Sequence, residues 1–452
     1  MTRLFGTNGI RGVVGEEMTP ALAHRVGRAA GFLWQGQPVA VGNDTRTSGP
    51  MLKAALISGL TAAGCQVSDL GAAPSPGVQL YVKEHDVVGG VIVTASHNPR
   101  EFNGLKVLDA EGMELPRTTE EEIERLYFEN AFEAPSWDTV GEVYPVRGAN
   151  RRYRDAILEQ VDREAIRKRR FRVVLDCANG ASSFTSPYVL ESLGCQVVTL
   201  NAQPDGTFPG HPPEPRPEHL EEMTALVEEA GADLGAAHDG DADRVIFSDE
   251  KGVYVYGDRS LALVSSHMVA KAGGGIVVTP VSSSSCVEDA VQEAGGQVVY
   301  TPVGAPLVAR KMLELHATFG GEENGGLIFP NHQYARDGAL GLAVMLEILA
   351  SGEATLSDRL RRIPTYHLVK GRWPCPPESR DDVMAALAQR VADRKVDRTD
   401  GLKVYYKTGW VLVRPSGTEA IIRVFSEGKT PEEAQGLYDE VSGFLEEIKV
   451  SL

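Results

Sequence analysis

One pattern occurs three times along the chain, and it restricts the fold more than any other feature of the sequence. Each copy has an apolar, strand-like run, a polar turn, a helical run that ends at a glycine, and a second strand-like run. The copies span residues 38–67, 171–197 and 275–298. Glycine readily adopts the left-handed conformation that ends a helix, so each copy is typical of a βαβ unit. Three such units predict three related α/β domains with mixed, largely parallel sheets.

The last part of the chain has a different pattern. A helical stretch at residues 379–394 precedes three strand-like runs, and a final helix begins at Thr430-Pro-Glu-Glu433, which has the residues of a capped helix start. This order predicts an α+β domain. The length of 452 residues fits three or four domains of roughly 100–200 residues each. We expect domains at residues 1–147, 148–250, 251–365 and 366–452.

Composition excludes several classes of protein. The net charge of −17 argues against a nucleic-acid-binding protein, because such a protein needs a basic face. No stretch approaches the roughly 20 apolar residues of a membrane span, and the first residues lack a secretory pattern. The five cysteines have no metal-site or disulfide-like spacing, so we expect reduced thiols. The composition therefore predicts a cytoplasmic protein that binds neither nucleic acid nor a membrane.

A serine stands in a turn that follows a strand-like run in the first expected domain. In Val91-Ile-Val-Thr-Ala-Ser-His-Asn-Pro99 the apolar residues give way to a short polar turn, and Pro99 keeps Asn98 out of helical conformation. Such a turn presents the hydroxyl of Ser96 and the imidazole of His97 beyond the end of the sheet. Ser96 could be a nucleophile or carry a phosphate, and an ordinary polar loop is the alternative.

Three aspartates alternate with small residues in Ala237-His-Asp-Gly-Asp-Ala-Asp-Arg-Val245. In extended backbone, this spacing of two places Asp239, Asp241 and Asp243 on one side of the chain. Carboxylates so close together repel one another unless a cation joins them, and an oxygen-only set with room for water and phosphate suits Mg²⁺. The alternative is an Asp/Gly-rich surface turn, but both flanks have the apolar character of buried strands.

Two further segments carry groups that suit a phosphorylated sugar. Arg414-Pro-Ser-Gly-Thr-Glu419 combines a guanidinium, two hydroxyls and backbone N–H groups, a set that binds phosphate well. Gly320-Gly-Glu-Glu-Asn-Gly-Gly326 offers two carboxylates and an amide, which suit sugar hydroxyls. The respective alternatives are a tight hairpin turn and a flexible acidic loop.

Together, these segments resemble the α-D-phosphohexomutase superfamily, which includes phosphoglucosamine mutases, phosphomannomutases and phosphoglucomutases. The resemblance covers nearly the whole chain, through the motifs Phe5–Gly12, Thr94–Pro99, Asp239–Arg244, Gly321–Gly326 and Arg414–Glu419. It implies four domains around a central cleft, of which the first three are related and the fourth is distinct. The Glu-Glu-Asn-Gly-Gly form of the fourth motif resembles archaeal-type members, often assigned to glucosamine or mannose phosphate conversion.

The resemblance also implies roles for individual residues. Ser96 would carry the phosphoryl group, and one Mg²⁺ would bind the phosphate on Ser96 together with Asp239, Asp241 and Asp243. Four side chains would surround the transferring group: Arg11, His97, Lys106 (a candidate general acid/base) and Arg244. Others would bind the substrate, Glu322 and Asn324 at the sugar hydroxyls, and Arg414, Ser416, Gly417 and Thr418 at the phosphate that does not react.

The implied reaction interconverts a hexose 6-phosphate and a hexose 1-phosphate, with a hexose 1,6-bisphosphate as intermediate and activator. Glucosamine phosphate is the expected substrate, and mannose and glucose phosphates are the alternatives. A phosphatase that is phosphorylated on Asp239 or Asp241 and a non-catalytic sugar-phosphate sensor are rival functions. We expect a monomer or a homodimer.

Three positions depart from the superfamily pattern. Asn43 stands where many members carry arginine, Gly326 where several bacterial members carry histidine, and Ala305 where relatives often have aspartate or histidine. The last two leave the preferred sugar open.

Overall fold

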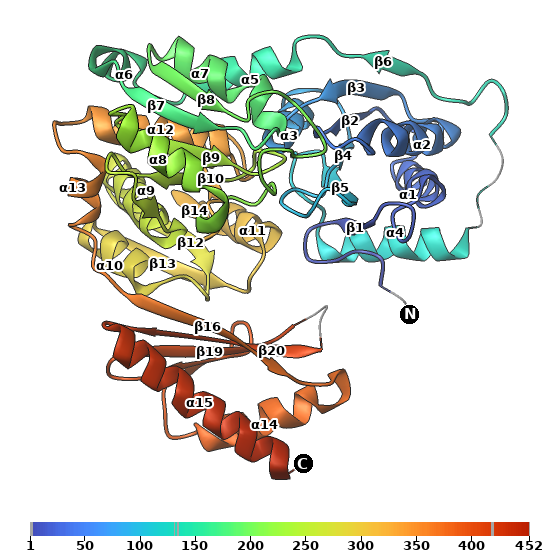
Figure 1. Ribbon diagram of the computed structural model, residues 1–452. Coiled ribbons are helices and arrows are strands. Elements are labelled where there is room, and N and C mark those ends of the chain that lie inside the picture. The colour runs from blue at the N-terminus through green and yellow to red at the C-terminus, as the bar shows by residue number, and fades with distance from the viewer. Residues whose placement is uncertain (1–2, 131, 133–134, 417–419, 452) are drawn as a thin grey trace.

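The computed structural model describes the chain except residues 1–2, 131, 133–134, 417–419 and 452. It contains four sheets, each formed by a continuous stretch of the chain and covered by helices (Figure 1). The first three sheets and their helices form the upper body in this view, with the first on the right, and the fourth sheet forms a lobe below. This arrangement confirms three α/β units and a distinct C-terminal unit.

The first three sheets share one topological core. In each, three parallel strands lie in the order second, first, third, and the third is followed by an antiparallel neighbour. These strands are β2 (Val39–Asn43), β3 (Val67–Ala72), β4 (Gly89–Val93) and β5 (Phe102–Asp109); β7 (Arg172–Asp176), β8 (Gln196–Leu200), β9 (Leu234–His238) and β10 (Val245–Ser248); and β12 (Gly275–Pro280), β13 (Gly296–Thr301), β14 (Phe319–Gly321) and β15 (Leu327–Ile328). The pattern repeated in the sequence is therefore a repeated fold.

Further strands lie at the edges of the first two sheets: β1 (Ile10–Val13), β6 (Val143–Pro145) and β11 (Tyr254–Val255). Helices connect the parallel strands of each core: α2 (Gly49–Ala62), α3 (Ser75–Glu84), α7 (Ser186–Ser192), α8 (Glu221–Glu229), α10 (Ser285–Glu293) and α11 (Ala305–Leu315). Gly64, Gly194 and Gly295 follow the first of these helices in each repeat, and their φ values are 90°, 75° and 84°. The left-handed helix ends expected from the sequence are thus confirmed.

Other helices flank the sheets: α1 (Pro20–Leu33), α4 (Arg117–Glu129), α5 (Ala149–Leu158), α6 (Arg163–Arg169), α9 (Gly257–Ala272), α12 (Gly338–Ala350) and α13 (Leu356–Leu360).

The second and third units share one apolar core. Helix α12 is buried over nearly its whole length. It belongs to a single cluster that includes Leu175 of β7 and Phe319 of β14. These two units therefore pack as one block, whereas the first unit and the C-terminal lobe have separate clusters.

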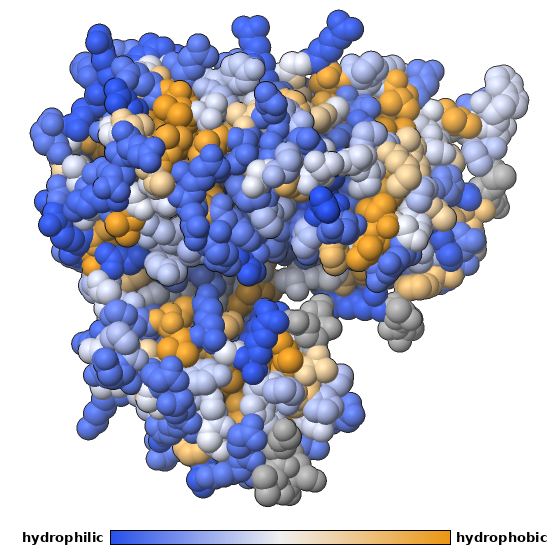
Figure 2. Space-filling model, viewed as in Figure 1, coloured by the Kyte–Doolittle hydropathy of each residue, from blue (hydrophilic) through white to orange (hydrophobic). Residues whose placement is uncertain are grey.

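The C-terminal lobe has an entirely antiparallel sheet with helices on one face. Its strands are β16 (His367–Pro374), β17 (Val396–Asp397), β18 (Leu402–Tyr405), β19 (Gly409–Pro415) and β20 (Ile421–Gly428), and its helices are α14 (Arg380–Arg390) and α15 (Pro431–Ser451). At the start of α15, Thr430 and Glu433 exchange hydrogen bonds of 3.2 Å, which confirms the expected helix cap. Figure 2 shows this lobe below a narrow waist, with hydrophilic residues over most of the visible face.

Two expectations from composition can be compared with the structure. All five cysteines are free thiols. Among the described residues, no helix combines the length and the apolar character needed to cross a membrane.

Candidate active site

The three motifs expected to act on the substrate occupy the same loop of the three repeated units. This loop joins the third parallel strand to its antiparallel neighbour: residues 94–101 between β4 and β5, 239–244 between β9 and β10, and 322–326 between β14 and β15. A side-chain contact joins the first loop to the second, and Arg336, which lies outside the loops, contacts both the second and the third. Segments that are far apart in the sequence are therefore brought to one place by the repeated fold.

Ser96 is held in a conformation that serine seldom adopts. Its φ is 51°, in the left-handed region. Its N–H donates to Thr94 Oγ1 at 2.9 Å, and its Oγ donates to Asp239 Oδ2 at 2.7 Å. Thr94 Oγ1 in turn donates to Asp44 Oδ2 at 2.6 Å. Both the backbone and the aspartate loop therefore fix the buried hydroxyl of Ser96.

Arg46 organises the serine loop, although the sequence did not single it out. Its buried guanidinium donates hydrogen bonds of 2.5 to 2.8 Å to four backbone carbonyl oxygens. Three of them belong to the loop (Ser96, Asn98 and Pro99), and the fourth belongs to Phe102, the first residue of β5. Its Nε lies 3.2 Å from Asp44 Oδ2. The sequence does contain one indication of this role, because Arg46 lies in the polar turn after β2. Since β2 pairs in parallel with β4, this turn and the serine loop lie at the same edge of the sheet. Asn43, in the same turn, donates to the Asp44 carbonyl at 2.7 Å, a local contact.

Asp239, Asp241 and Asp243 form a compact set of oxygen ligands. One carboxylate oxygen of each lies within 4.8 Å of the others, and all three residues are buried. Within the described part of the chain, Asp241 Oδ1 and Asp243 Oδ1 are buried without a hydrogen-bond partner. The hydroxyl of Ser75, at the start of α3, donates to Asp241 Oδ2 at 2.6 Å. Free carboxylate oxygens beside the Ser96 hydroxyl fit a hard cation, so these residues could hold a metal.

The three carboxyl groups have different proton affinities. Burial raises the pKa of Asp239, and the charges of Asp243 and Asp241 act in the same direction. Burial also acts to raise the pKa of Asp241 and Asp243, but Lys106 and Arg336 outweigh it and lower both. A divalent cation among the three would favour the ionised form of every one of them.

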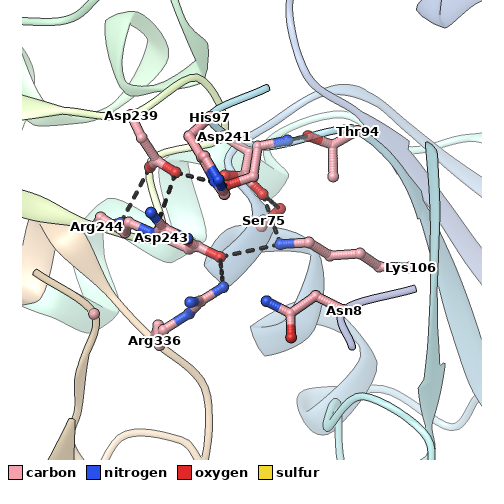
Figure 3. A network of polar contacts seen from close by, with 12 residues as sticks. Asn8, Ser75, Thr94, His97, Lys106, Asp239, Asp241, Asp243, Arg244 and Arg336 are labelled. Carbon is pink, nitrogen blue, oxygen red and sulfur yellow. Dashed lines mark hydrogen bonds and ion pairs between the residues drawn. The ribbon is translucent and has the colours of Figure 1, made fainter. Parts of the chain in front are cut away.

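Two of the cationic side chains expected around the transferring group, Lys106 and Arg244, contact this set. Lys106 Nζ, on β5, donates to Asp241 Oδ2 at 2.8 Å and to Asp243 Oδ2 at 3.0 Å (Figure 3). Burial acts to lower the pKa of Lys106, but the two carboxylates raise it above its ordinary value, so the amine is charged. Arg244 Nε lies 3.8 Å from Asp239 Oδ2 and 3.7 Å from Asp243 Oδ1.

Arg11 and His97 lie next to the serine loop. Arg11 Nη1, on β1, donates to Asn98 Oδ1 at 2.7 Å and to Ala95 O at 3.2 Å. Its Nη2 is buried and has no hydrogen-bond partner among the described residues. His97 Nδ1 lies 3.4 Å from Ser96 Oγ, and the charge of Arg244, burial and Arg11 lower the pKa of its imidazole. A neutral imidazole and an available guanidinium N–H beside the serine could bind phosphoryl oxygens.

The third loop places Glu322 and Asn324 next to the aspartates. Glu322 Oε2 accepts from Arg336 Nη1 at 3.0 Å and from Asn324 Nδ2 at 3.5 Å. The N–H of Val245 donates to Gly325 O at 3.0 Å, which ties this loop to β10. The residues expected to bind the sugar thus lie directly against the strand that leaves the aspartate loop.

Two of the expected phosphate-binding residues, Arg414 and Ser416, lie on the C-terminal lobe at the end of β19. Arg414 Nε lies 2.5 Å from Asp400 Oδ2, and its side chain is partly exposed. Ser416 is buried beside it. Gly417 and Thr418 lie outside the described residues.

Ser75 and Arg336, like Arg46, are site residues that the sequence did not reveal. Each contacts an aspartate of the second loop, over a separation of 166 residues for Ser75 and 93 for Arg336. No local spacing marks such contacts, because they depend on how the units pack together.

Comparison with known proteins agrees with this geometry. Models of the phosphoglucomutase/phosphomannomutase family match four segments: alpha/beta/alpha domain I at residues 2–134, domain II at 151–252, domain III at 256–366 and the C-terminal domain at 376–443.

Related proteins extend over the same length. The phosphoglucomutase/phosphomannomutase of Thermococcus kodakarensis is 44% identical over 442 residues, which cover 96% of each chain. A probable phosphoglucosamine mutase of Methanopyrus kandleri is 44% identical over 442 residues, 97% of each chain. The crystal structure of a phosphoglucomutase/phosphomannomutase family protein from Burkholderia thailandensis has a TM-score of 0.90 at 28% identity, covering 99% of this chain and 97% of the other. The chain therefore belongs to the phosphoglucomutase/phosphomannomutase family, within the α-D-phosphohexomutase superfamily.

Proposed function

We propose that this protein is a phosphohexomutase that interconverts glucosamine 6-phosphate and glucosamine 1-phosphate through a phosphorylated Ser96. The observation that carries the proposal is the hydrogen bond from Ser96 Oγ to Asp239, within a set of three buried aspartates. A hydroxyl fixed beside metal-binding oxygens suits a group that gains and loses a phosphoryl group. The name of the Methanopyrus kandleri relative, a probable phosphoglucosamine mutase, supports glucosamine as the sugar. Mannose and glucose phosphates are the alternative substrates.

Each half-reaction exchanges one O–P bond for another. Phosphorylated Ser96 transfers its phosphoryl group to the free hydroxyl of the sugar phosphate, which gives the hexose 1,6-bisphosphate. The sugar then turns over, and its other phosphate returns to Ser96. In the first transfer the sugar hydroxyl loses a proton and Ser96 Oγ gains one. We assign this exchange to Lys106, whose charged amine would give a proton to Ser96 Oγ and recover one from the sugar hydroxyl. Arg11, His97 and Arg244 would bind the oxygens of the transferring group.

The aspartates would hold one Mg²⁺ together with the phosphate on Ser96. When bound, this ion would neutralise charge on the transferring phosphoryl group. The free oxygens of Asp241 and Asp243 support this assignment.

The remaining contacts would be made by the sugar loop and the C-terminal lobe. Glu322 and Asn324 would bind sugar hydroxyls, because together they offer acceptors and a donor. The phosphate that stays on the sugar would be bound by Arg414, Ser416, Gly417 and Thr418. Both orientations of the sugar must fit one site, so these residues would recognise groups common to the two isomers.

We also propose that the protein is a cytoplasmic monomer or homodimer whose domain boundaries lie near residues 147, 250 and 365. The free thiols suit a reducing compartment.

The proposal is tested by locating the phosphate and measuring turnover. After incubation with glucose 1,6-bisphosphate and Mg²⁺, the intact mass should rise by about 80 Da, and the phosphate should map to Ser96. A panel of glucosamine, mannose, glucose and N-acetylglucosamine phosphates should give the highest kcat/KM with glucosamine. Phosphate on an aspartate would indicate a phosphatase instead. Stoichiometric binding without turnover of any sugar would indicate a sensor.

A further inference from the structure

Arg336 occupies the space that a side chain at position 326 would need. A Cβ built on Gly326 would meet Arg336 Cδ and would lie 3.0 Å from Arg336 Cγ. These atoms belong to the middle of the arginine side chain, so Arg336 would have to leave its position. The side chain of Arg336 can therefore take this position only because residue 326 is glycine.

Backbone contacts direct Arg336 onto the sugar loop. The residue forms an isolated antiparallel bridge with Ile328, at the end of β15. The N–H of Asp337 donates to Leu327 O at 2.8 Å. The segment before α12 is thus folded back along the strand that follows Glu322 and Gly326.

The guanidinium of Arg336 joins the second and third functional loops. Its Nη1 lies 3.0 Å from Glu322 Oε2, and its Nη2 lies 2.6 Å from Asp243 Oδ2, a pair visible in Figure 3. Only 3% of the side chain is exposed. The planar fork of arginine can bind two carboxylates at once, which the single ammonium of lysine cannot do with the same geometry.

We propose that Arg336 is a positioning residue with opposite effects on two ligands. It holds the Glu322 carboxylate in the orientation that receives the sugar, and its positive charge opposes the divalent cation at the Asp243 carboxylate, whose Oδ2 it shares with Lys106. This inference rests on the proposed function, because it takes Glu322 as a sugar ligand and Asp243 as a metal ligand. Loss of the guanidinium therefore weakens sugar binding and strengthens cation binding, whereas a general loss of structure would weaken both.

The test compares Mg²⁺ binding with substrate kinetics in Arg336→Gln. We expect KM for glucosamine 1-phosphate, at saturating Mg²⁺, to rise about tenfold, with a smaller change in kcat. In calorimetric titrations without substrate, the Kd for Mg²⁺ should fall about threefold or more, because a neighbouring positive charge has been removed. Arg336→Lys keeps the charge but loses the fork, so its Mg²⁺ affinity should stay near that of the wild type while KM rises.

Gly326→Ala provides a second route to the same effect. Its Cβ displaces Arg336, so KM should rise and the Kd for Mg²⁺ should fall as in Arg336→Gln. The double variant should be no worse than either single one, because both remove the same contact. Gly443→Ala is the control for the added methyl group, since a Cβ there meets nothing within 4 Å. Arg117→Gln on α4 is the control for an arginine paired with several carboxylates.

Two outcomes would overturn this inference. Weaker binding of both Mg²⁺ and sugar phosphate in Arg336→Gln and Gly326→Ala would show that Arg336 only supports the local structure. Unchanged KM and unchanged Mg²⁺ affinity would show that it positions neither ligand. A wild-type protein that converts no hexose phosphate would instead contradict the proposed function, and the Mg²⁺ titration would still test the effect of the arginine charge at Asp243.

Discussion

Two groups of carboxylates lie in different parts of the molecule and differ in what surrounds them. Asp241 and Asp243 lie 2.6 to 3.0 Å from the amine of Lys106 or the guanidinium of Arg336. The second group comprises Asp258, Glu323 and Glu427, and these residues line a cavity of about 1520 Å³ between the third unit and the C-terminal lobe.

The donors in the second group are neutral. Ser284 N–H donates to Asp258 Oδ1 at 2.9 Å, and Trp410 Nε1 donates to Glu427 Oε1 at 2.7 Å. Burial and the charge of Glu323 raise the pKa of Asp258 to about 7.

The difference shows that burial alone does not decide the charge of a carboxyl group. A cation in direct contact lowers the pKa of Asp241 and Asp243 in spite of burial. Where the direct donors are neutral and other acids lie close by, the carboxyl group takes up a proton near neutral pH. The first group is therefore suited to a multivalent cation and the second to protons.

The largest expected effect concerns the hydroxyl of Ser96, which contacts Asp239, the neighbour of the first group in the aspartate loop. Ser96→Ala should reduce kcat by about a thousandfold or more, because no oxygen remains to carry the phosphoryl group. Ser265→Ala, at a buried serine of α9, is the control and should keep full activity. Turnover of Ser96→Ala within about tenfold of the wild type would mean that another residue carries the phosphate.

A matched pair of substitutions compares the two groups directly. Asp241→Asn should weaken Mg²⁺ binding by about tenfold to a hundredfold, because an anionic ligand becomes a neutral amide. Asp258→Asn makes the same chemical change in the second group and should leave Mg²⁺ affinity unchanged. Calorimetric titration of both variants measures this contrast. Equal losses would show that the two groups do not differ in the way we describe.

Arg414 represents a third situation, a partly exposed ion pair outside both groups. Its contact with Asp400 would be exchanged for a contact with the substrate phosphate. Arg414→Ala should raise KM for both sugar phosphate isomers by about tenfold and change kcat less. Steady-state kinetics in both directions tests this, and an unchanged KM would place the bound phosphate elsewhere.

The smallest expected effect is a pH dependence of stability at Asp258. Its folded pKa of about 7 lies above the ordinary value of 3.8, so the folded protein holds this proton more tightly than the unfolded chain. Ionisation of Asp258 therefore lowers stability as pH rises from about 4 to about 7. Relative to the wild type, Asp258→Asn should gain about 1–3 kcal/mol over that range and nothing further above it. Denaturant unfolding at several pH values measures the difference, and a constant difference would contradict the raised pKa.

The sequence was sufficient for the features that depend on local spacing. The strand, helix and glycine pattern predicted the three repeated units, and the glycines at 64, 194 and 295 have the expected conformation. Asp239, Asp241 and Asp243 converge within 4.8 Å as predicted, but the extended backbone assumed for them was wrong. They lie on a turn in which Ala242 has a φ of 60°.

Features that depend on packing between units could not be predicted in this way. Arg336 reaches Asp243 because the segment before α12 folds back on β15, and nothing in the local sequence indicates its partner. The core shared by the second and third units has the same origin, since apolar residues alone do not specify which sheet they will face. The raised pKa of Asp258 depends on its burial and on Glu323, which is 65 positions away in the sequence.

The repeated loop position also gives the active site a modular character. Each functional loop begins and ends on its own strands, so its residues can be exchanged while the sheet beneath keeps its hydrogen bonds. Under the proposed function, a change of sugar preference would then require substitutions at 322–326, at position 305 or in the arginine that covers this loop. The loops proposed to carry the phosphate and the metal would stay as they are, and one scaffold could serve a series of enzymes with different sugars.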